Sequence, residues 1–218
     1  NIRGRVIRRK NQGKLRLFNR TNRSFPTGLM KLVCDELRRL EIGYKVEKHF
    51  SYPQTSVINN WLRPEQKEAL DRALFRKRGI LWVPTGGGKT EIAISLALSV
   101  KTRWLFLVNK KDLLYQAAKR YELRSNLAAG IIGDGILKTE NFTVAMFQTL
   151  ARGLDKHKEL LESCGGIIVD ECHTLPARSF LKVTSACKNA VYRIGLSGTP
   201  LARGDKKSIF AIGALGNV

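Results

Sequence analysis

The sequence offers little that would cross-link the chain, bind a structural metal or cross a membrane. Its 218 residues include only four cysteines, and no two of these form a Cys-X-X-Cys pair. That usage disfavours a disulfide framework or a zinc site and favours reduced thiols. No apolar run approaches the ~18 residues that a membrane-spanning helix needs, and the first ten residues, NIRGRVIRRK, lack the apolar core of a secretion signal. We therefore expect a cytoplasmic protein with no membrane partner and no structural metal.

Acidic residues are scarce, and the first of them is Asp35. The chain carries 39 Lys and Arg against 18 Asp and Glu, a formal net charge of +21. Nine basic residues fall within the first 23 positions. Such a surplus favours a polyanionic partner, because each Lys or Arg that neutralises a phosphate releases a condensed counterion. A nucleic acid is favoured on charge alone; a generally basic, solvated surface is the alternative, and no amphipathic lysine-rich helix supports an acidic membrane.

The first 50 residues predict a small α+β unit. Its expected elements are two strands joined by a turn, a helix and a third strand, at 5–9, 14–18, 27–42 and 44–48. The uncharged, turn-rich segment 51–60 is expected to be a linker. A unit of this size buries little core alone, so we expect it to pack on the rest of the chain.

Residues 61–218 alternate between apolar strands and amphipathic helices. The expected strands are 80–83, 104–108, 144–146, 167–169 and 191–194. The expected helices are 64–77, 89–99, 110–124, 155–162 and 177–188. Repeated strand–helix units with apolar strands predict an α/β fold whose parallel sheet is covered by helices on both faces. Ligands are then expected at the carboxyl ends of the strands.

The segment 83–90, VPTGGGKT, follows an apolar strand and opens a helix, which is the context that a phosphate-binding loop requires. Its three glycines let the backbone N–H groups turn inward, and the helix N-terminus adds positive potential. Lys89 is expected to reach the β- and γ-phosphates, and the Thr90 hydroxyl to ligate Mg²⁺. A glycine-rich turn without a ligand is the alternative, and the pattern's first glycine is Val83 here.

A second motif, GIIVDECH, occupies residues 166–173, and its Asp170 lies 81 residues after Lys89. Three apolar residues deliver Asp170 and Glu171 to the end of a predicted strand. Asp170 is expected to hold Mg²⁺ through water, and Glu171 is placed to polarise an attacking water. A solvated turn is the alternative for an isolated acidic pair, but the preceding phosphate loop favours the catalytic interpretation.

These residues resemble motifs I and II of the DECH-box helicases and translocases of superfamily 2, and the resemblance covers residues 61–218. Further motifs follow in the family's order: LRPEQ at 62–66, LFLVN at 105–109 (motif Ia), VAMFQTL at 144–150 (a DNA-contact motif) and GLSGTP at 195–200 (motif III). The resemblance implies a RecA-like P-loop fold, ATP hydrolysis, and ATP and Mg²⁺ as cofactors.

The resemblance also implies roles for individual residues. The implied ATP-binding residues are Arg63, Gln66, Pro84, Thr85, Gly86, Gly87, Gly88, Lys89, Thr90 and Glu91. The implied catalytic residues are Lys89, Asp170, Glu171 and His173, with Thr90 and Asp170 as metal ligands. Ser197 and Thr199 would couple the ATP state to the grip on DNA. The implied nucleic-acid contacts in this region are Asn109, Lys110, Gly133, Gln148 and Thr149.

The N-terminal 50 residues are similar to the small N-terminal domain of phage recombination helicases of the UvsW type. The similarity rests on the basic hairpin, on FPTG at 25–28 leading into a helix, and on Gly43-Tyr44. Arg5, Arg8 and Arg9 of the hairpin are expected nucleic-acid contacts, because guanidinium groups bind phosphate oxygens in pairs. A solvated basic hairpin is the alternative.

The predicted organisation is a basic nucleic-acid-binding domain at 1–50, a linker at 51–60 and a first RecA-like motor domain at 61–218. A second RecA-like domain is expected downstream, and without it we expect poor ATP turnover. The implied function is that of an ATP-dependent DNA helicase or branched-DNA translocase, acting on branched or double-stranded DNA in recombination and repair in a bacterial or phage-infected cell. The alternatives are a nucleic-acid-binding module that uses ATP as a conformational ligand, and the motor part of a restriction translocase or RNA helicase.

Overall fold

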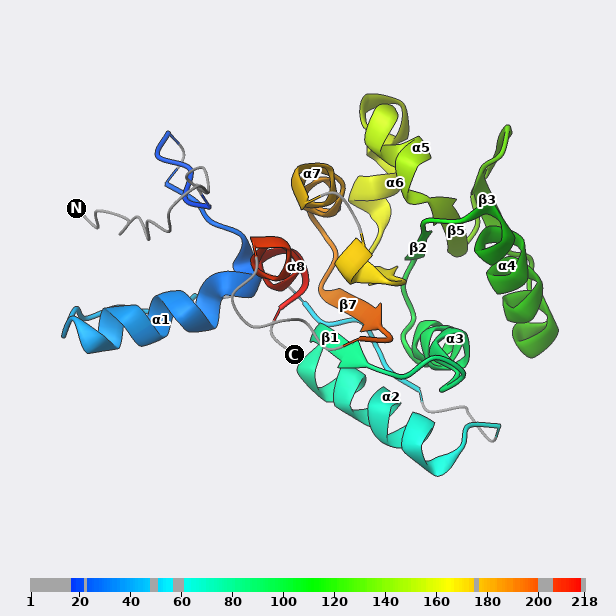
Figure 1. Ribbon diagram of the computed structural model, residues 1–218, viewed down its shortest axis with the longest axis horizontal. Helices are drawn as coiled ribbons and strands as arrows, with labels where there is room; N and C mark the ends of the chain where they lie inside the picture. The colour runs from blue at the N-terminus through cyan, green and yellow to red at the C-terminus, as the bar shows by residue number, and fades with distance from the viewer. Residues whose placement is uncertain are drawn as a thin grey trace.

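The computed structural model describes residues 17–21, 23–47, 51–56, 61–174, 177–199 and 206–216. Most of them form one twisted sheet with helices on both faces (Figure 1). The expected strand at 5–9 lies outside the described residues, as do Arg5, Arg8 and Arg9. No helix of the described part is long and apolar enough to cross a membrane.

The sheet has seven strands in the order β1-β7-β6-β2-β5-β3-β4. They are β1 (Arg78–Trp82), β2 (Trp104–Val108), β3 (Gly130–Gly133), β4 (Ile136–Lys138), β5 (Phe142–Met146), β6 (Gly166–Val169) and β7 (Tyr192–Ser197). All neighbouring strands are parallel except β3 and β4, which form an antiparallel hairpin at the edge. This arrangement confirms the predicted α/β, RecA-like fold.

Helices cover the two faces of the sheet in two groups. The described helices that follow the linker are α2 (Pro64–Arg76), α3 (Lys89–Ser99), α4 (Lys111–Ser125), α5 (Phe147–Arg152), α6 (Lys158–Ser163), α7 (Ala177–Ala186) and α8 (Lys206–Leu215). Helices α2, α3 and α4 pack on one face, and α5 to α8 pack on the other (Figure 1). In β2 the side chains alternate, so that Phe106 faces the first group and Leu105 and Leu107 face the second. Burial on both sides explains why this strand is apolar throughout.

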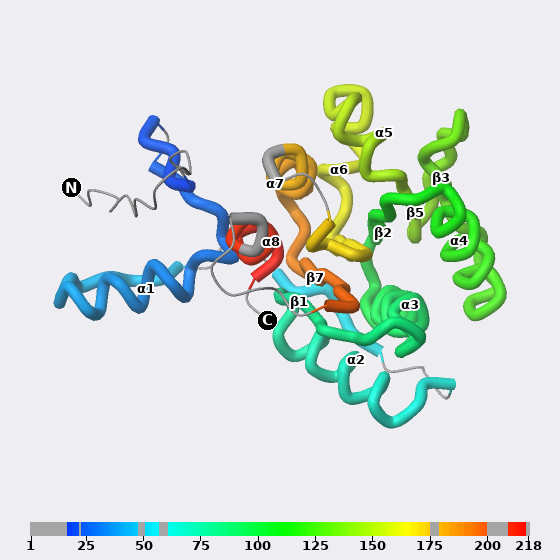
Figure 2. Tube along the Cα trace, viewed as in Figure 1, coloured from blue at the N-terminus to red at the C-terminus, as the bar shows by residue number. Residues whose placement is uncertain are grey.

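In the N-terminal part, an antiparallel bridge between Asn19 and Ser24 precedes a 3₁₀ turn, η1 (Thr27–Leu29), which continues as α1 (Met30–Arg39). The turn packs against α8, as the adjoining blue and red segments in Figure 2 show. A Cβ atom on Gly28 would come within 2.0 Å of the Ile212 carbonyl oxygen, so only glycine permits this approach. The Thr27 hydroxyl also accepts a hydrogen bond from Arg78 of β1.

Two expectations for the N-terminal part need correction. The helix expected at 27–42 is α-helical only over 30–39, because it opens as a 3₁₀ turn and ends near Glu41, whose φ is +55°. The strand expected at 44–48 is not formed: the described residues 44–47 are exposed and belong to no strand of the described structure. An exposed segment without a partner strand leaves its backbone to water, so alternation alone does not make it a strand.

The first half of the expected linker is hydrogen-bonded to the end of α3. Thr55 forms an antiparallel bridge with Val100, the Ser56 amide donates to the Ser99 carbonyl at 2.7 Å, and the Lys101 amide donates to the Gln54 carbonyl at 3.0 Å. These bonds lie directly after α3, which begins at the phosphate loop. Residues 51–56 therefore attach to the carboxyl end of the helix that begins at the VPTGGGKT loop.

Candidate functional site

The expected phosphate loop connects β1 to α3 and has the glycine conformations that such a loop needs. Gly86 and Gly88 have φ values of +79° and +83°, in the left-handed region that side chains disfavour. Gly87 has no room for a side chain, because a Cβ there would come within 2.7 Å of a Val83 methyl carbon. Val83, which replaces the motif's usual first glycine, therefore packs against the loop without disrupting its turn.

Gln66 and Arg63, at the start of α2, are tied to this loop. The Gln66 amide donates to the Gly87 carbonyl at 3.0 Å, and the Arg63 guanidinium donates to the same oxygen at 3.2 Å. The Gln66 Oε1 atom accepts the Arg63 backbone N–H at 3.0 Å, and the side chain is 5% exposed. These bonds hold the LRPEQ segment, with two of the implied ATP-binding residues, against the expected phosphate loop.

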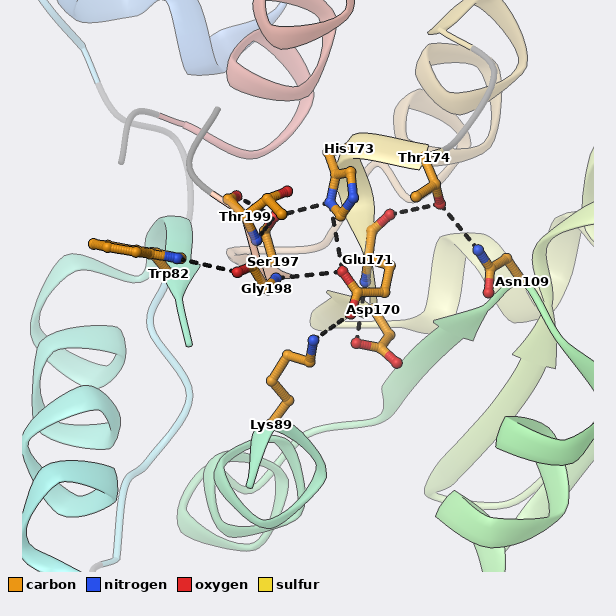
Figure 3. A network of polar contacts seen from close by, with 10 residues as sticks. All are labelled: Trp82, Lys89, Asn109, Asp170, Glu171, His173, Thr174, Ser197, Gly198 and Thr199. Carbon is orange, nitrogen blue, oxygen red and sulfur yellow. Dashed lines mark hydrogen bonds and ion pairs between the residues drawn. The ribbon is translucent and has the colours of Figure 1, made fainter. Parts of the chain in front are cut away.

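Lys89 and Glu171 form an ion pair at the centre of the site (Figure 3). The second oxygen of the Glu171 carboxylate accepts the Gly198 amide at 3.3 Å. Burial raises the pKa of Glu171, but the hydrogen bonds from Lys89 and Gly198 outweigh it and lower the pKa below its ordinary value. The Glu171 carboxylate is therefore ionised at neutral pH and available as a base or hydrogen-bond acceptor.

Asp170 and Thr90 line one cavity of about 140 Å³ between α3 and α4, together with Gln116 and Arg120. Asp170 is 7% exposed, and burial raises the pKa of its carboxyl group although Lys89 lies nearby. A buried carboxylate and a hydroxyl are hard oxygen ligands of the kind that Mg²⁺ prefers. The residues therefore fit this cation, which when bound would neutralise Asp170 and stabilise charge on the phosphates.

Motif III reaches the site through Ser197, at the end of β7. The Ser197 hydroxyl donates to the Thr199 carbonyl at 2.6 Å and lies 2.8 Å from His173 Nδ1. A hydroxyl has one proton, so a Ser197 that donates to the Thr199 carbonyl pairs with the His173 tautomer that carries a proton on Nδ1. The same ring nitrogen lies 3.5 Å from Glu171 Oε2. His173 thus connects motif III to the Glu171 carboxylate (Figure 3).

The expected nucleic-acid contacts gather at the same edge of the sheet, beyond the neighbouring strands β2, β5 and β3. Asn109 follows β2, Gln148 follows β5, and Gly133 ends β3. The Gln148 amide donates to the Asn109 carbonyl at 3.0 Å. Lys110 is exposed and Thr149 is half-buried. The structure therefore brings the described members of the predicted set together beside the nucleotide motifs.

Glu91 occupies a different environment from the other expected ATP-binding residues. Its carboxylate contacts Arg120 at 3.2 Å and Arg124 at 3.1 Å, both on α4, and its side chain is 13% exposed. These pairs join α3 to α4. The sequence interpretation missed them because the arginines lie 29 and 33 residues further along the chain.

Two further polar contacts were not expected from the motifs. The Asn109 side-chain amide donates to the Thr174 hydroxyl at 2.9 Å, and the Trp82 indole N–H donates to the Gly198 carbonyl at 3.2 Å. Thr174 directly follows the DECH motif and Trp82 precedes the expected phosphate loop. Only this closeness to a motif in the sequence could have indicated that the two residues belong to the site. Both contacts join segments that the chain brings together only on folding.

Comparison with known proteins places these motifs in a family. The sequence profile described as "Type III restriction enzyme, res subunit" (ResIII) matches residues 50–202. The DNA 3'-5' translocase XPB2 of Sulfurisphaera tokodaii is 31% identical over 151 residues, which cover 69% of this chain and 34% of that protein. The ATP-dependent DNA helicase uvsW of Enterobacteria phage T4 is 27% identical over 239 residues, covering 94% of this chain and 46% of that protein. The chain thus spans less than half the length of either relative.

Solved structures share the fold. The crystal structure of the UvsW helicase from bacteriophage T4 matches with a TM-score of 0.78 and 23% identity, covering 94% of this chain and 82% of that chain. The Sulfolobus solfataricus SWI2/SNF2 ATPase core in complex with dsDNA matches with a TM-score of 0.57 and 19% identity, covering 77% and 38% of the two chains. Because the family profile covers most of the chain and its motifs converge at one edge of the sheet, the chain belongs to the ResIII family of superfamily 2 DNA helicases and translocases.

Proposed function

We propose that this protein is an ATP-driven motor that moves on double-stranded or branched DNA in recombination or repair. One observation carries the proposal: the Lys89–Glu171 pair lies at the same carboxyl edge of the sheet as Asn109 and Gln148. The names of the XPB2 and uvsW relatives support DNA as the substrate. The phage relative also supports a bacterial or phage-infected cell as the setting.

In the proposed mechanism, the triphosphate competes with Glu171 for the Lys89 ammonium. Lys89 then binds phosphate oxygens together with the inward-facing amides of the loop, while Thr90 and Asp170 would hold Mg²⁺. Release from Lys89 leaves the Glu171 carboxylate free to accept a hydrogen bond from the attacking water and then its proton. His173 and the Gly198 amide keep this carboxylate oriented during the exchange.

The proposal also includes parts that lie outside the described residues. A basic clamp at Arg5, Arg8 and Arg9 would hold the DNA backbone beside the motor, and a second RecA-like domain would complete the ATP site. An arginine supplied by such a domain contributes ~10³-fold or more to phosphoryl transfer in P-loop enzymes. Residues 1–218 alone should therefore turn ATP over slowly.

ATP turnover of the full-length protein, measured with and without added duplex and branched DNA, tests this function. We expect turnover to rise when DNA is added and labelled strands of branched DNA to be displaced. ATP binding without DNA-stimulated turnover would instead support a module that uses ATP as a conformational ligand. The profile's description makes restriction translocation the second candidate, and DNA-stimulated turnover without strand displacement would favour it.

A further inference from the structure

The backbone of Glu171, the proposed catalytic residue, has an unusual conformation. Glu171 has a φ of +44°, in the left-handed region, where a residue with a side chain costs about 1–2 kcal/mol. Such a conformation persists only where its surroundings hold it. Here it directs the Glu171 side chain toward Lys89 and Gly198 (Figure 3). The direction in which the carboxylate points therefore depends on the contacts that keep the Glu171 backbone in this conformation.

Thr174 holds the Glu171 peptide twice. The Thr174 amide donates to the Glu171 carbonyl at 2.9 Å, which closes the 3₁₀ turn η3 (Cys172–Thr174), and the Thr174 hydroxyl donates to the same oxygen at 2.8 Å. The hydroxyl proton is thereby used, so its oxygen can only accept further bonds. It accepts the Asn109 amide at 2.9 Å. Asn109 thus orients the hydroxyl that fixes Glu171.

Asn109 also contacts Gln148, which follows the neighbouring strand β5. Strand β2, which Asn109 follows, lies between β6 and β5. The Asn109 carbonyl accepts the Gln148 amide at 3.0 Å. The other amide atom, Gln148 Oε1, is buried and has no hydrogen-bond partner within the described residues. An unpartnered buried acceptor costs about 1–3 kcal/mol, so Gln148 gains when a hydrogen-bond donor reaches Oε1.

We propose that Asn109 and Thr174 are positioning residues for ATP hydrolysis, and that nucleic acid at Asn109 and Gln148 acts on Glu171 through them. The inference rests on the proposed function, because it concerns how DNA stimulates turnover. Two groups of contacts then fix Glu171. Its carboxylate lies beside His173, which contacts Ser197. Its backbone carbonyl is bonded by Thr174, which Asn109 contacts. A nucleic-acid backbone that engages either amide redistributes this hydrogen-bond chain and shifts the population of the catalytic conformation.

Thr174→Val tests the chain with little change in shape, because it replaces the hydroxyl by a methyl group. In the full-length protein at saturating duplex DNA, we expect kcat for ATP to fall about tenfold, the loss expected from one supporting hydrogen bond. The KM for ATP and the affinity for a fluorescent ATP analogue should not change. Thr174→Ser keeps the hydroxyl and should restore kcat.

Asn109→Ala should reproduce the same loss of kcat, and the double variant should lose no more than either single variant, because both residues act through one chain. Asn189→Ala provides a matched control. This substitution also removes a side-chain amide that donates to a backbone carbonyl, that of Glu162 at 2.7 Å. Asn189, however, precedes β7 and so lies at the amino edge of the sheet, away from the site. Its kinetic constants should equal those of the parent.

Hydrogen exchange gives a readout that does not depend on turnover. The Thr174 amide should exchange faster in ligand-free Asn109→Ala and Thr174→Val than in the parent, since the Glu171 carbonyl that it bonds is held less firmly. Unchanged exchange, unchanged kcat in Thr174→Val, or an Asn109→Ala effect confined to the DNA concentration needed for half-activation would overturn the inference. A parent without DNA-stimulated turnover would instead contradict the proposed function, and it would be seen before any variant is compared.

Discussion

The two halves of the sheet's carboxyl edge are built differently. At β1, β7 and β6 the polar side chains are buried or half-buried and joined by polar contacts: Lys89 pairs with Glu171, and the buried Ser197 contacts His173. At β2, β5 and β3 the charges lie at the surface: Lys111 and Asp134 pair at 2.8 Å with 59% and 32% of their side chains exposed. Phosphoryl chemistry needs fixed geometry, whereas a grip on a nucleic-acid backbone needs accessible donors and charges.

The difference predicts that substitutions in the two halves affect different ligands. A change in the buried half should remove nucleotide binding or chemistry and leave most nucleic-acid affinity intact. Removal of an exposed charge in the other half should alter nucleic-acid affinity and its salt dependence while nucleotide affinity stays the same. Asn109 is the exception, because its amide also bonds Thr174 and its loss should lower kcat.

The largest expected effect comes from Lys89→Ala. Loss of the charge-assisted hydrogen bonds from the ammonium should weaken ATP-Mg²⁺ binding by about a hundredfold. Titration calorimetry measures this, and thermal unfolding should show that the variant remains folded. Lys110→Ala, in the exposed half, is the control and should keep the parent's ATP affinity. An unchanged affinity in Lys89→Ala would remove the phosphate-loop assignment.

Removal of the basic N-terminal segment should change how DNA binding depends on salt. If Arg5, Arg8 and Arg9 neutralise three phosphates, deletion of residues 1–58 should reduce the slope of log K against log salt by about 2.7 on duplex DNA. Binding titrations over a salt series compare the two forms. ATP affinity should be the same in both. Equal slopes would show that the hairpin is a solvated surface.

Glu91→Gln should affect stability rather than nucleotide binding. The substitution leaves Arg120 and Arg124 without the carboxylate that joins α3 to α4. We expect the free energy of unfolding to fall by about 1 kcal/mol, since both arginines are partly exposed. Urea denaturation measures the change. A tenfold loss of ATP affinity at unchanged stability would support the ATP-binding role that the resemblance implies for Glu91.

The smallest effect concerns pH. Glu171 has a lowered pKa in the folded protein, so its ionised form stabilises the fold; this contribution is present above the ordinary value of 4.5 and is lost as the pH falls through the lowered value. The difference in unfolding free energy between the parent and Glu171→Gln should therefore be constant near neutral pH and change in favour of Gln below pH 4.5. Urea denaturation at several pH values measures it. A relative gain of the parent in acid would contradict the assignment.

Much of the fold was predictable because most strands after residue 77 are short apolar runs separated by helices. The β3–β4 hairpin was missed, since β3 and β4 have only four and three residues and Ile136 and Leu137 of β4 are exposed. Helix α5 was missed because it begins directly after β5 with no breaking residue between them. The strand expected at 44–48 shows the opposite error, alternation without a partner.

In the site, the sequence predicted which residues carry the motifs but not how they contact one another. Spacing placed Lys89 and Glu171 at strand ends, and the parallel sheet brought those ends together. The hydrogen bond from Asn109 to Thr174 spans 65 residues and joins two motifs, so neither motif alone predicts it. The left-handed backbone of Glu171 likewise depends on tertiary contacts that no local pattern encodes.

Glu171→Gln in the full-length protein tests the central claim most directly, because it keeps the size of the side chain and removes its basicity. Binding titrations and ATP turnover should be measured on the same preparation, with and without duplex DNA. We expect parent-like affinities for ATP-Mg²⁺ and DNA, with turnover reduced about a hundredfold or more at every DNA concentration. Turnover at the parent rate would contradict the central claim, because Glu171 would then not be the residue that activates water.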